Sequence, residues 1–487
     1  MTGTHVEQRL TGSLSTMPAE SAAERIADDA TVLVSGFGSV GYPKAVPLAL
    51  AESGRDLDLT IVSGGSVGDE IDTALVEAGA IARRYPFQAT RAMRTAINER
   101  RVAFSDRSVS ELGDEVQYGG LVDPDIAVVE AVAVGEDWFI PSTSIGQTPA
   151  FVEAAPELIV EVNHAQPLAL QAVHDVYRPG PPPDREPVPL TDPGGRIAGP
   201  RVEFDPEKLV AVVETDRKDT TYSFRDPTAT DRKIAAHFGE FLATEIDRSA
   251  VFEDRVHLQF GMGSMGNALM GELTELSFGG RDVVYFGEVI QDGLLDMLDS
   301  GRMTSASATS LALTEQGQHR LFDGIEGFAS DIVLRPTDVS NSPALIDRFG
   351  VIAVNSALEV DLYGNANSTH IGGTDVINGI GGAADFNANA LVSVCALPST
   401  LGDGDRSRIV PMTFHVDSTE HDIDVVVTEH GVADLRGLAP AERAQTIVEK
   451  CAHPSVRPAL QEYLDAASAR SGHVPQDLER AVEWRDR

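Results

Sequence analysis

One carboxylate, Glu288, stands where a predicted strand changes into a predicted helix. The preceding residues 282–286 are β-branched and aromatic, as in a buried strand, and the leucines that follow recur with helical spacing up to Gly301. Glu288 is therefore expected at the carboxyl end of a strand, and ligands of open α/β sheets gather in the crevice outside such ends. This position favours a chemical role. The structural alternative, a charge that complements the dipole of the helix start, stays open from position alone.

The two halves of the chain carry a weak internal repeat. Residues 36–41 read GFGSVG and residues 261–266 read GMGSMG, each after an apolar run. Farther on, residues 58–64 (DLTIVSG) align by spacing with residues 282–288 (DVVYFGE), so that Gly64 takes the place of the carboxylate. The repeat predicts two halves with one fold, of which only the second carries the reactive group. Chance similarity between short glycine motifs is the alternative.

The first glycine motif also raises the possibility of a nicotinamide dehydrogenase. Gly36, Gly38 and Gly41 satisfy G-x-G-x-x-G after a predicted strand. However, Pro43 and Pro47 interrupt the helix that such a site requires, and no strand ending in a ribose-binding acid follows at about 20 residues. The chain also lacks GxxxxGK[ST], so both nucleotide-binding classes are disfavoured.

A stretch rich in proline and glycine, residues 177–200, divides the chain. Such a sequence cannot continue a helix or a central strand, so it predicts an extended connection. A length of 487 residues exceeds the usual span of one hydrophobic core. We therefore expect two α/β domains, residues 1–222 with the connector and residues 223–487 with Glu288.

The charge is strongly acidic. Against 75 Asp and Glu stand 38 Lys and Arg, giving a formal net charge of −37, and lysine occurs only five times. This balance argues against nucleic acid or an anionic membrane as partner. A lysine-poor acidic surface is typical of cytosolic proteins from salt-loving microbes, in which salt screens the self-repulsion. An ordinary acidic cytosolic protein is the alternative.

Cysteine content and hydropathy limit the cellular compartments that are expected for this protein. Cys395 and Cys451 belong to no CxxC pair, so a disulfide framework or a structural zinc site is not expected. The N-terminus lacks a signal-peptide pattern, and no apolar run approaches the roughly 18 residues that span a bilayer. The expectation is a soluble, cytoplasmic protein.

A third glycine cluster reads NGIGGAAD at residues 378–385. Glycines allow a ligand to approach closely and leave backbone N–H groups free to face an anion. An oxyanion hole requires such donors. A tight turn between strands is the structural alternative.

Several long motifs in order resemble the acetyl-CoA hydrolase/transferase family, which contains succinyl-CoA:acetate CoA-transferases and acetyl-CoA hydrolases. The motifs are SGFGSVGYPKAVP (35–47), PSTSIGQTP (141–149), GEVIQDGLLDMLDSG (287–301), ALEVDLYGNANSTHIGG (357–373), NGIGGAADF (378–386) and TEHGVADLRG (428–437). The resemblance implies two similar open α/β domains of the CoA-transferase (NagB/RpiA/CoA-transferase-like) type, and a homodimer.

The resemblance also assigns site residues. It implies that Glu288 is the nucleophile and becomes a glutamyl-CoA thioester, with Asn341 and Glu429 as further active-site residues. Coenzyme A enters as substrate and no metal is needed. The positions that match the CoA-binding and oxyanion segments are Gly261, Met262, Gly263, Ser264, Met265, Asn378, Gly381 and Gly382.

The activity implied is transfer of CoA from acetyl-CoA or succinyl-CoA to acetate or a related short acid. Hydrolysis of acetyl-CoA through the same glutamate is the alternative, and a non-catalytic CoA-binding protein is a third. One motif departs from the family, because PSTLG at residues 398–402 has Gly402 where members commonly have a CoA-holding lysine. Either Arg406 or Arg408 compensates, or the CoA contact is weaker.

Overall fold

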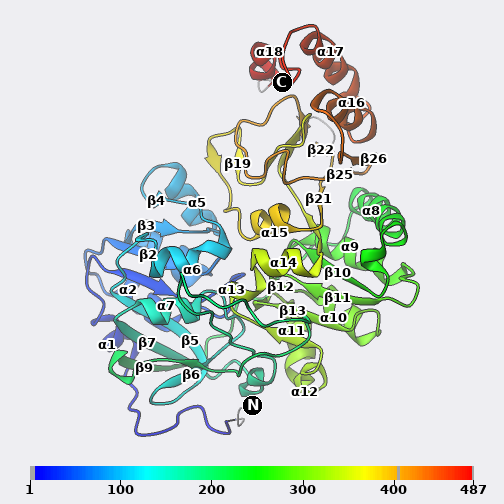
Figure 1. The fold of residues 1–487 in the computed structure, drawn as a ribbon. Helices are drawn as coiled ribbons and strands as arrows, with labels where there is room; N and C mark the ends of the chain where they lie inside the picture. Colours follow the sequence, from blue (N-terminus) through cyan, green and yellow to red (C-terminus); the bar gives the residue numbers. More distant parts are fainter. Residues whose placement is uncertain (1–5, 403–405, 485–487) are drawn as a thin grey trace. The chain divides into compact units, whose positions relative to one another are not determined.

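The computed structural model describes residues 6–402 and 406–484. They form two compact units (Figure 1): Met1–Ser223 with Tyr285–Leu345, and Phe224–Val284 with Ile346–Arg487. The segment that contains Glu288 therefore belongs to the same unit as the N-terminal residues. The division into domains 1–222 and 223–487 stays a prediction.

The first unit is built on a nine-stranded, mostly parallel sheet. Its central strand β5 pairs in parallel with β1 and β7 through its first half, and antiparallel with β6 through its second. The order β4-β3-β2-β1-β5 continues through β7 to β9 on one path and through β6 to β8 on the other. The strands are β1 (Thr31–Val34), β2 (Leu59–Ser63), β3 (Ile81–Tyr85), β4 (Ala103–Phe104), β5 (Ile126–Val134), β6 (Trp138–Pro141), β7 (Glu157–Asn163), β8 (Val202–Glu203) and β9 (Leu209–Thr215).

Alternation along these strands supplies two hydrophobic cores, one on each face of the sheet. In β1, Val32 and Val34 pack into one core and Leu33 into the other, because successive side chains point to opposite faces. The first core includes residues of α1 (Ala19–Ala23), α2 (Ala45–Glu52), α3 (Asp69–Asp72), α4 (Ala74–Glu77) and α5 (Arg91–Asn98). The second core is covered by α6 (Val109–Gln117) and α7 (Thr148–Ala154), which lie together in Figure 1.

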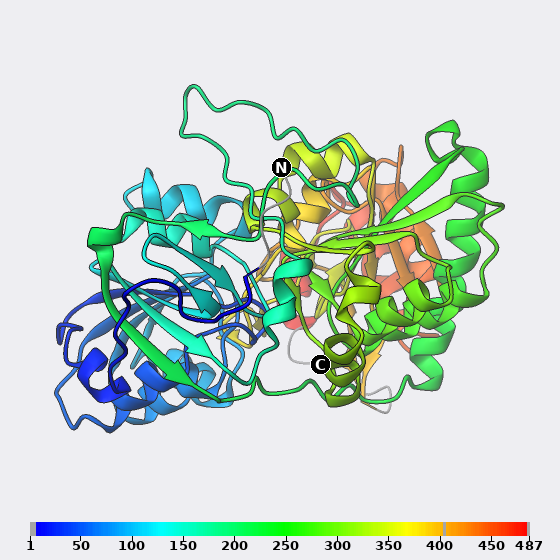
Figure 2. The same cartoon turned by 90° about the horizontal axis from the view of Figure 1, so that it is seen from below.

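The proline-rich stretch 177–200, all of it described, contains no helix or strand and runs as a long loop (Figure 2). It stays within the first unit. The buried Arg335 guanidinium donates to the carbonyls of Pro193 and Gly195 and pairs with Asp175. The loop is therefore fastened to the segment that follows Glu288.

That later segment of the first unit consists of short elements. Strand β12 (Val289–Ile290) pairs in parallel with β14 (Ser310–Leu311), and β13 (Ser305–Ala308) with β15 (Ile332–Leu334). The neighbouring helices are α10 (Asp292–Asp299), α11 (Glu315–Asp323), α12 (Ile325–Phe328), α13 (Thr337–Ser340) and α14 (Pro343–Phe349), the last of which runs across the limit between the units.

The second unit repeats part of the first sheet. Its strands β10 (Arg255–Phe260), β16 (Ile352–Asn355), β21 (Val392–Ala396) and β25 (Val425–Thr428) are parallel neighbours in that order, as are β1, β5, β7 and β9. Strand β26 (Gly431–Asp434) adds an antiparallel edge. This correspondence supports the internal repeat expected from the glycine motifs.

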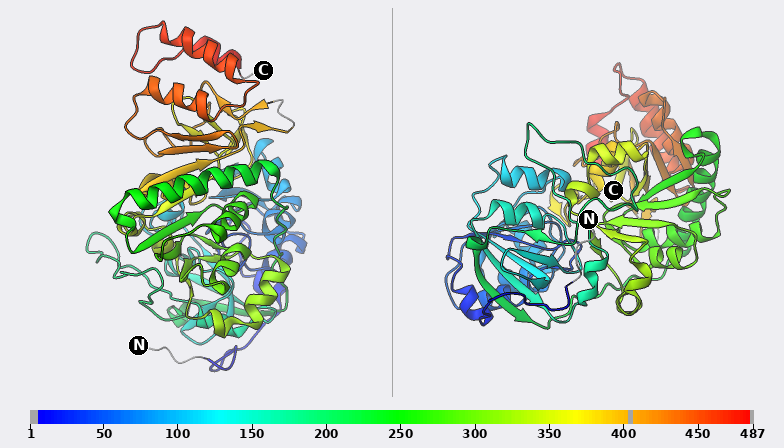
Figure 3. Two further views of the ribbon diagram at one scale, coloured as in Figure 1. Left: turned by 90° about the vertical axis from the view of Figure 1, so that its right-hand side faces the viewer. Right: turned by 60° about the horizontal axis from the view of Figure 1, so that its bottom comes forward.

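Long helices cover this second sheet. Helix α8 (Ala229–Arg248) begins with a capping box between Thr228 and Asp231 and packs against α9 (Ser264–Glu275), β25 and β26 (Figure 3). The other helices of this unit are α15 (Ala383–Asn389), α16 (Pro440–Lys450), α17 (Arg457–Ser468) and α18 (Leu478–Trp484). Short strand pairs involve β17 (Glu359–Asp361), β18 (Ala366–Asn367), β19 (His370–Ile371), β20 (Asp375–Val376), β22 (Thr400–Leu401), β23 (Arg406–Ser407) and β24 (Ile409–Val410).

Candidate active site

Glu288 lies in the bend that follows β11 (Asp282–Phe286), at a strand end as the sequence predicts. The expected direct change from strand to helix is wrong, because the short strand β12 lies between Glu288 and α10. The backbone at Glu288 is fixed on both sides. The N–H of Gly287 donates to the Ser307 carbonyl at 3.0 Å, and the Glu288 carbonyl accepts from the N–H groups of Thr309 (2.8 Å) and Ser310 (3.1 Å). The side chain is only half-buried. A rigid turn thus holds a carboxylate that remains partly accessible.

Asn341 contacts this carboxylate directly. Its Nδ2 donates to Oε1 of Glu288 at 3.0 Å, although 53 residues separate the two in the chain. Asn341 is fully buried and caps α13, and its own N–H donates to the Thr337 carbonyl at 2.9 Å. Two of the residues assigned to the site by resemblance are therefore brought together.

Tyr285 lies beneath the turn. It is fully buried, and burial, followed by the charge of Glu288, raises the pKa of its hydroxyl, which therefore stays neutral. A Cβ at Gly287 would overlap this hydroxyl, so residue 287 has to be glycine for the turn to close over Tyr285. The Tyr285 hydroxyl is also hydrogen-bonded to the backbone of Glu288 and Val289, so the tyrosine supports the turn from below.

The motif at residues 141–149 supports the same turn. The N–H groups of Ile145 and Gly146 donate to the carbonyl (2.9 Å) and the hydroxyl (2.8 Å) of Thr309, and the Leu311 N–H donates to the Thr143 carbonyl at 3.1 Å. Thr309 thereby links this segment to the Glu288 carbonyl. Sequence reasoning gave the motif no role, because hydrogen bonds between segments so far apart leave no local signal.

The first glycine motif also lies beside Glu288. Gly38 has a φ of +64°, and a Cβ there would lie 3.0 Å from Oγ of Ser310 and 3.9 Å from Cγ2 of Val289. The Ser144 hydroxyl donates to the Val40 carbonyl at 2.9 Å and thereby binds this loop to residues 141–149. The loop with the dinucleotide-like glycine motif therefore contacts β12 and β14, the strands next to Glu288.

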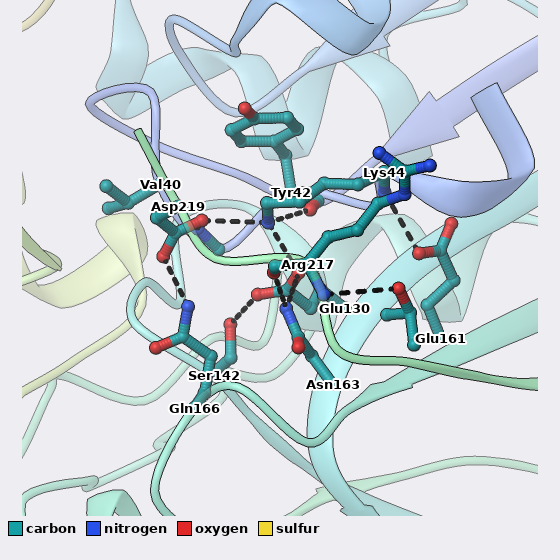
Figure 4. Close-up of polar contacts among 12 residues, drawn as sticks. Val40, Tyr42, Lys44, Glu130, Ser142, Glu161, Asn163, Gln166, Arg217 and Asp219 are labelled. Carbon is teal, nitrogen blue, oxygen red and sulfur yellow. Dashed lines mark hydrogen bonds and ion pairs between the residues drawn. The ribbon is translucent and has the colours of Figure 1, made fainter. Parts of the chain in front are cut away.

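A buried ionic network connects the glycine loop at residues 36–41 with residues 141–149 (Figure 4). Lys44 Nζ lies 2.6 Å from Glu130 and 2.8 Å from Asp219, and all three side chains are inaccessible to solvent. Asp219 accepts from the Thr143 hydroxyl at 2.5 Å and from the Gly41 N–H at 3.3 Å. Burial raises the pKa of Glu130 to about 7. No local sequence pattern indicates this network, because its members lie far apart in the chain.

Glu429 belongs to the second unit, in the turn between β25 and β26. Its carboxylate accepts from the backbone N–H (2.9 Å) and the hydroxyl (2.5 Å) of Ser399. Glu429 is therefore held by the 398–402 segment.

The predicted CoA-binding glycines also lie in the second unit. Gly263 (φ +126°) precedes α9, and Gly381 (φ +58°) lies just before α15. Asn355 connects the two segments, because a Cβ at Gly261 would meet its Oδ1 at 3.2 Å, while its Nδ2 donates to Asn387 on α15 at 3.0 Å. The two clusters are thus neighbours within this unit.

The remaining predicted positions frame these clusters. Met262 is exposed, Ser264 and Met265 form the half-buried start of α9, and Gly382 caps α15. The side-chain oxygen of Asn378 is buried and accepts no hydrogen bond from the described residues. An acceptor in this state is available to a ligand donor.

The position of the missing lysine is also defined. Gly402 is exposed with a φ of +58°. Arg408 donates to the carbonyls of Ala357 and Leu358, both at 2.7 Å, and burial lowers its pKa. Arg406 is exposed and lines a cavity of about 220 Å³ in the second unit. Of the two arginines, Arg406 is the one whose charge faces solvent.

Within residues 6–402 and 406–484, no cluster of three or more His, Cys, Asp or Glu side chains is arranged to hold a metal ion. Nor does this part of the chain include a helix of the length and apolarity needed to cross a bilayer.

The two mostly parallel sheets covered by helices define an α/β fold of the type found in CoA-transferases. Solved structures share this fold. RipA from Yersinia pestis superimposes with a TM-score of 0.69 at 21% identity, over 93% of this chain and 96% of that one. A 4-hydroxybutyrate CoA-transferase from Porphyromonas gingivalis gives 0.62 at 22% identity, over 92% and 97%. The predicted fold class is confirmed.

Family models and relatives then fix the family. The models for the N-terminal and C-terminal domains of acetyl-CoA hydrolase/transferase match residues 13–214 and 317–464. The chain belongs to this family and is an enzyme of this kind, a group that covers both activities. It is 40% identical to a succinyl-CoA:acetate CoA-transferase of Clostridium kluyveri (96% of this chain, 87% of the relative), and 38% identical to both a propanoyl-CoA:succinate CoA transferase of Escherichia coli (96% and 96%) and an acetyl-CoA hydrolase of Kluyveromyces lactis (96% and 93%).

Proposed function

We propose that the protein transfers CoA between a short acyl-CoA, such as acetyl-CoA or succinyl-CoA, and a small carboxylic acid such as acetate, through a glutamyl-CoA thioester on Glu288. One observation carries the proposal. The Glu288 carboxylate is half-buried on a fixed turn and accepts a hydrogen bond from the buried Asn341 amide.

The chemistry needs only this carboxylate and preorganised donors. A Glu288 oxygen attacks the acyl-CoA carbonyl and the C–S bond breaks. CoA departs as the thiolate, and Glu288 and the acyl group are joined as a mixed anhydride. The thiolate then attacks the Glu288 carbonyl carbon and expels the original acid as a carboxylate, leaving the glutamyl-CoA thioester. An acceptor carboxylate reverses both steps. Because the thioester energy is retained throughout, no ATP is consumed.

Asn341 has a defined role in these steps. Its Nδ2 faces Oε1 of Glu288, which becomes the carbonyl oxygen of the anhydride and the thioester. Each attack on that carbonyl carbon places negative charge on this oxygen. A preorganised N–H donor at an oxyanion contributes about 10²–10³ in kcat.

The second unit supplies the proposed CoA contacts. The glycine segments at 261–265 and 378–382 lie at the starts of α9 and α15, and the side-chain oxygen of Asn378 is a buried acceptor without a hydrogen-bond partner among the described residues. Glu429, held by Ser399, is proposed as a further active-site carboxylate. Gly402 stands where family members commonly have a CoA-holding lysine, and Arg406 is proposed to take the role of that lysine.

Transfer and hydrolysis differ in what attacks the intermediates. If water reaches the anhydride or the thioester, the enzyme acts as a hydrolase through the same glutamate. The relatives include a CoA-transferase and an acetyl-CoA hydrolase, so they support either outcome. Incubation with acetyl-CoA, with and without succinate, tests the proposal. We expect acetyl-CoA to be consumed only when succinate is present, with succinyl-CoA and acetate formed and no net release of free thiol. Release of free thiol from acetyl-CoA without any acid would identify a hydrolase.

The cellular setting is also proposed. The net charge of −37 with only five lysines suits a cytoplasm of high salt, where counterions screen the acidic surface. We further propose a homodimer, in line with the family resemblance; sedimentation at several protein concentrations tests this assembly.

A further inference from the structure

We propose that Ser340 is a positioning residue for the Glu288 chemistry, and that it acts through Asn341 by fixing the plane of the amide that faces Glu288. This inference rests on the proposed function of Glu288 and deepens it. The juxtaposition that carries it is a line of three side chains, Ser340, Asn341 and Glu288, joined by two hydrogen bonds.

The two hydrogen bonds hold the Asn341 amide at its oxygen and at its nitrogen. The Ser340 hydroxyl donates to Oδ1 at 2.8 Å, and Nδ2 donates to Glu288 Oε1 at 3.0 Å. Ser340 and Asn341 are both fully buried. An amide held only at Nδ2 can rotate about its last torsion, whereas one held at both ends has a fixed plane and a fixed donor direction.

The hydrogen bond from Ser340 matters because the charge of the Glu288 side chain changes during the reaction. As a carboxylate it attracts the Nδ2 donor strongly, but as an anhydride or thioester carbonyl it is neutral and attracts the donor less. Ser340 keeps its contact with Oδ1 through these changes. Donation to Oδ1 also polarises the amide, so the Nδ2–H group becomes a better donor when the oxyanion forms.

The hydroxyl itself is presented by a fixed helix turn. The Thr337 N–H donates to the Gly146 carbonyl at 3.0 Å, which attaches the start of α13 to the 141–149 segment. The same segment binds Thr309, whose N–H holds the Glu288 carbonyl. Ser340 and Glu288 are therefore positioned by one common frame.

The same helix turn offers a matched control. The Thr337 hydroxyl is also fully buried, but it has no hydrogen-bond partner among the described residues. Replacing it by the isosteric valine removes a buried hydroxyl from α13 without touching the Asn341 amide. Any loss that comes only from disturbing the helix should appear in both variants.

Steady-state kinetics with acetyl-CoA and succinate test the inference. Ser340→Ala should lower kcat about tenfold and change the KM for acetyl-CoA less than twofold, while Thr337→Val should keep kcat near the wild-type value. Ser340→Cys keeps a weak donor and should give an intermediate kcat. In an Asn341→Ala background, Ser340→Ala should change kcat less than about twofold, because its effect passes through the missing amide.

Three results would overturn the inference: a wild-type kcat in Ser340→Ala, an equal loss in Thr337→Val, or the same loss in the Asn341→Ala background as in the wild type. If Ser340→Ala does not fold, a wild-type kcat in Ser340→Cys would overturn it instead. Borohydride trapping separates this failure from that of the proposed function. An adduct on Glu288 with an unaffected Ser340→Ala enzyme refutes only the role of Ser340, whereas full activity in Glu288→Ala refutes the proposed function itself.

Discussion

Asn341 directs its Nδ2 at Oε1 of Glu288 across 3.0 Å, from a buried helix end to a half-buried turn. We expect Asn341→Ala to lower kcat about 10²–10³-fold with little change in KM, because the donor acts on charge that develops in the transition state. Initial rates over a range of acetyl-CoA concentrations measure this. Asn98→Ala, exposed at the end of α5, is the control. A rise in KM at constant kcat would speak for ground-state binding instead.

Gly38 is predicted to be intolerant of a side chain. Gly38→Ala combines a φ of +64° with a Cβ only 3.0 Å from Ser310 Oγ, so it should both destabilise the fold and lower kcat by disturbing the turn of Glu288. Gly54 has a similar φ of +67° but open space around its Cβ. Gly54→Ala should therefore cost only the left-handed strain, about 1–2 kcal/mol, and keep kcat. Urea unfolding and kcat measurements on both variants test this prediction. Equal kcat values in the two variants would contradict the role of the contact between residue 38 and Ser310.

Glu130 should make stability depend on pH. Its pKa in the folded protein, about 7, lies above the ordinary 4.5, so the folded state retains a proton that the unfolded state has lost. The contribution of Glu130 to the free energy of unfolding is therefore full below pH 4.5 and is lost as the pH rises towards 7. Relative to Glu130→Gln, the wild type should lose up to about 3 kcal/mol over this range. Denaturant unfolding at several pH values measures the difference. Parallel pH curves would contradict the raised pKa.

Salt should stabilise the protein. A net charge of −37 repels itself in the folded state, and potassium chloride screens that repulsion. We expect the free energy of unfolding, measured by thermal or urea denaturation, to rise as potassium chloride is added. Stability that is flat or falling with salt would rule out the proposed high-salt setting.

The part of the site that local pattern determines could be predicted from the sequence. Glu288 at a strand end followed from the composition of residues 282–286 and the helical spacing after them. The alignment of Gly64 with Glu288 also pointed to a repeated sheet, and the parallel neighbours in the two units support it. Asn341 entered only through resemblance, because no local pattern reports a contact over 53 residues.

The supporting contacts could not be predicted for a physical reason. The Lys44 network, the place of Gly38 against Ser310, and the fastening of the 177–200 loop by Arg335 all join distant segments. Composition indicated that this loop is irregular, but not which residues hold it. The assignment of residues 285–345 to the first unit depends on the same kind of long-range contact.

The covalent role of Glu288 is tested by incubating the protein with acetyl-CoA alone, reducing it with borohydride and mapping the modified peptide by mass spectrometry. A thioester on Glu288 is reduced to an alcohol, so we expect loss of activity, a modified residue at position 288, and protection by excess acceptor acid. Modification at another residue, or full activity in Glu288→Ala, would contradict the proposed mechanism.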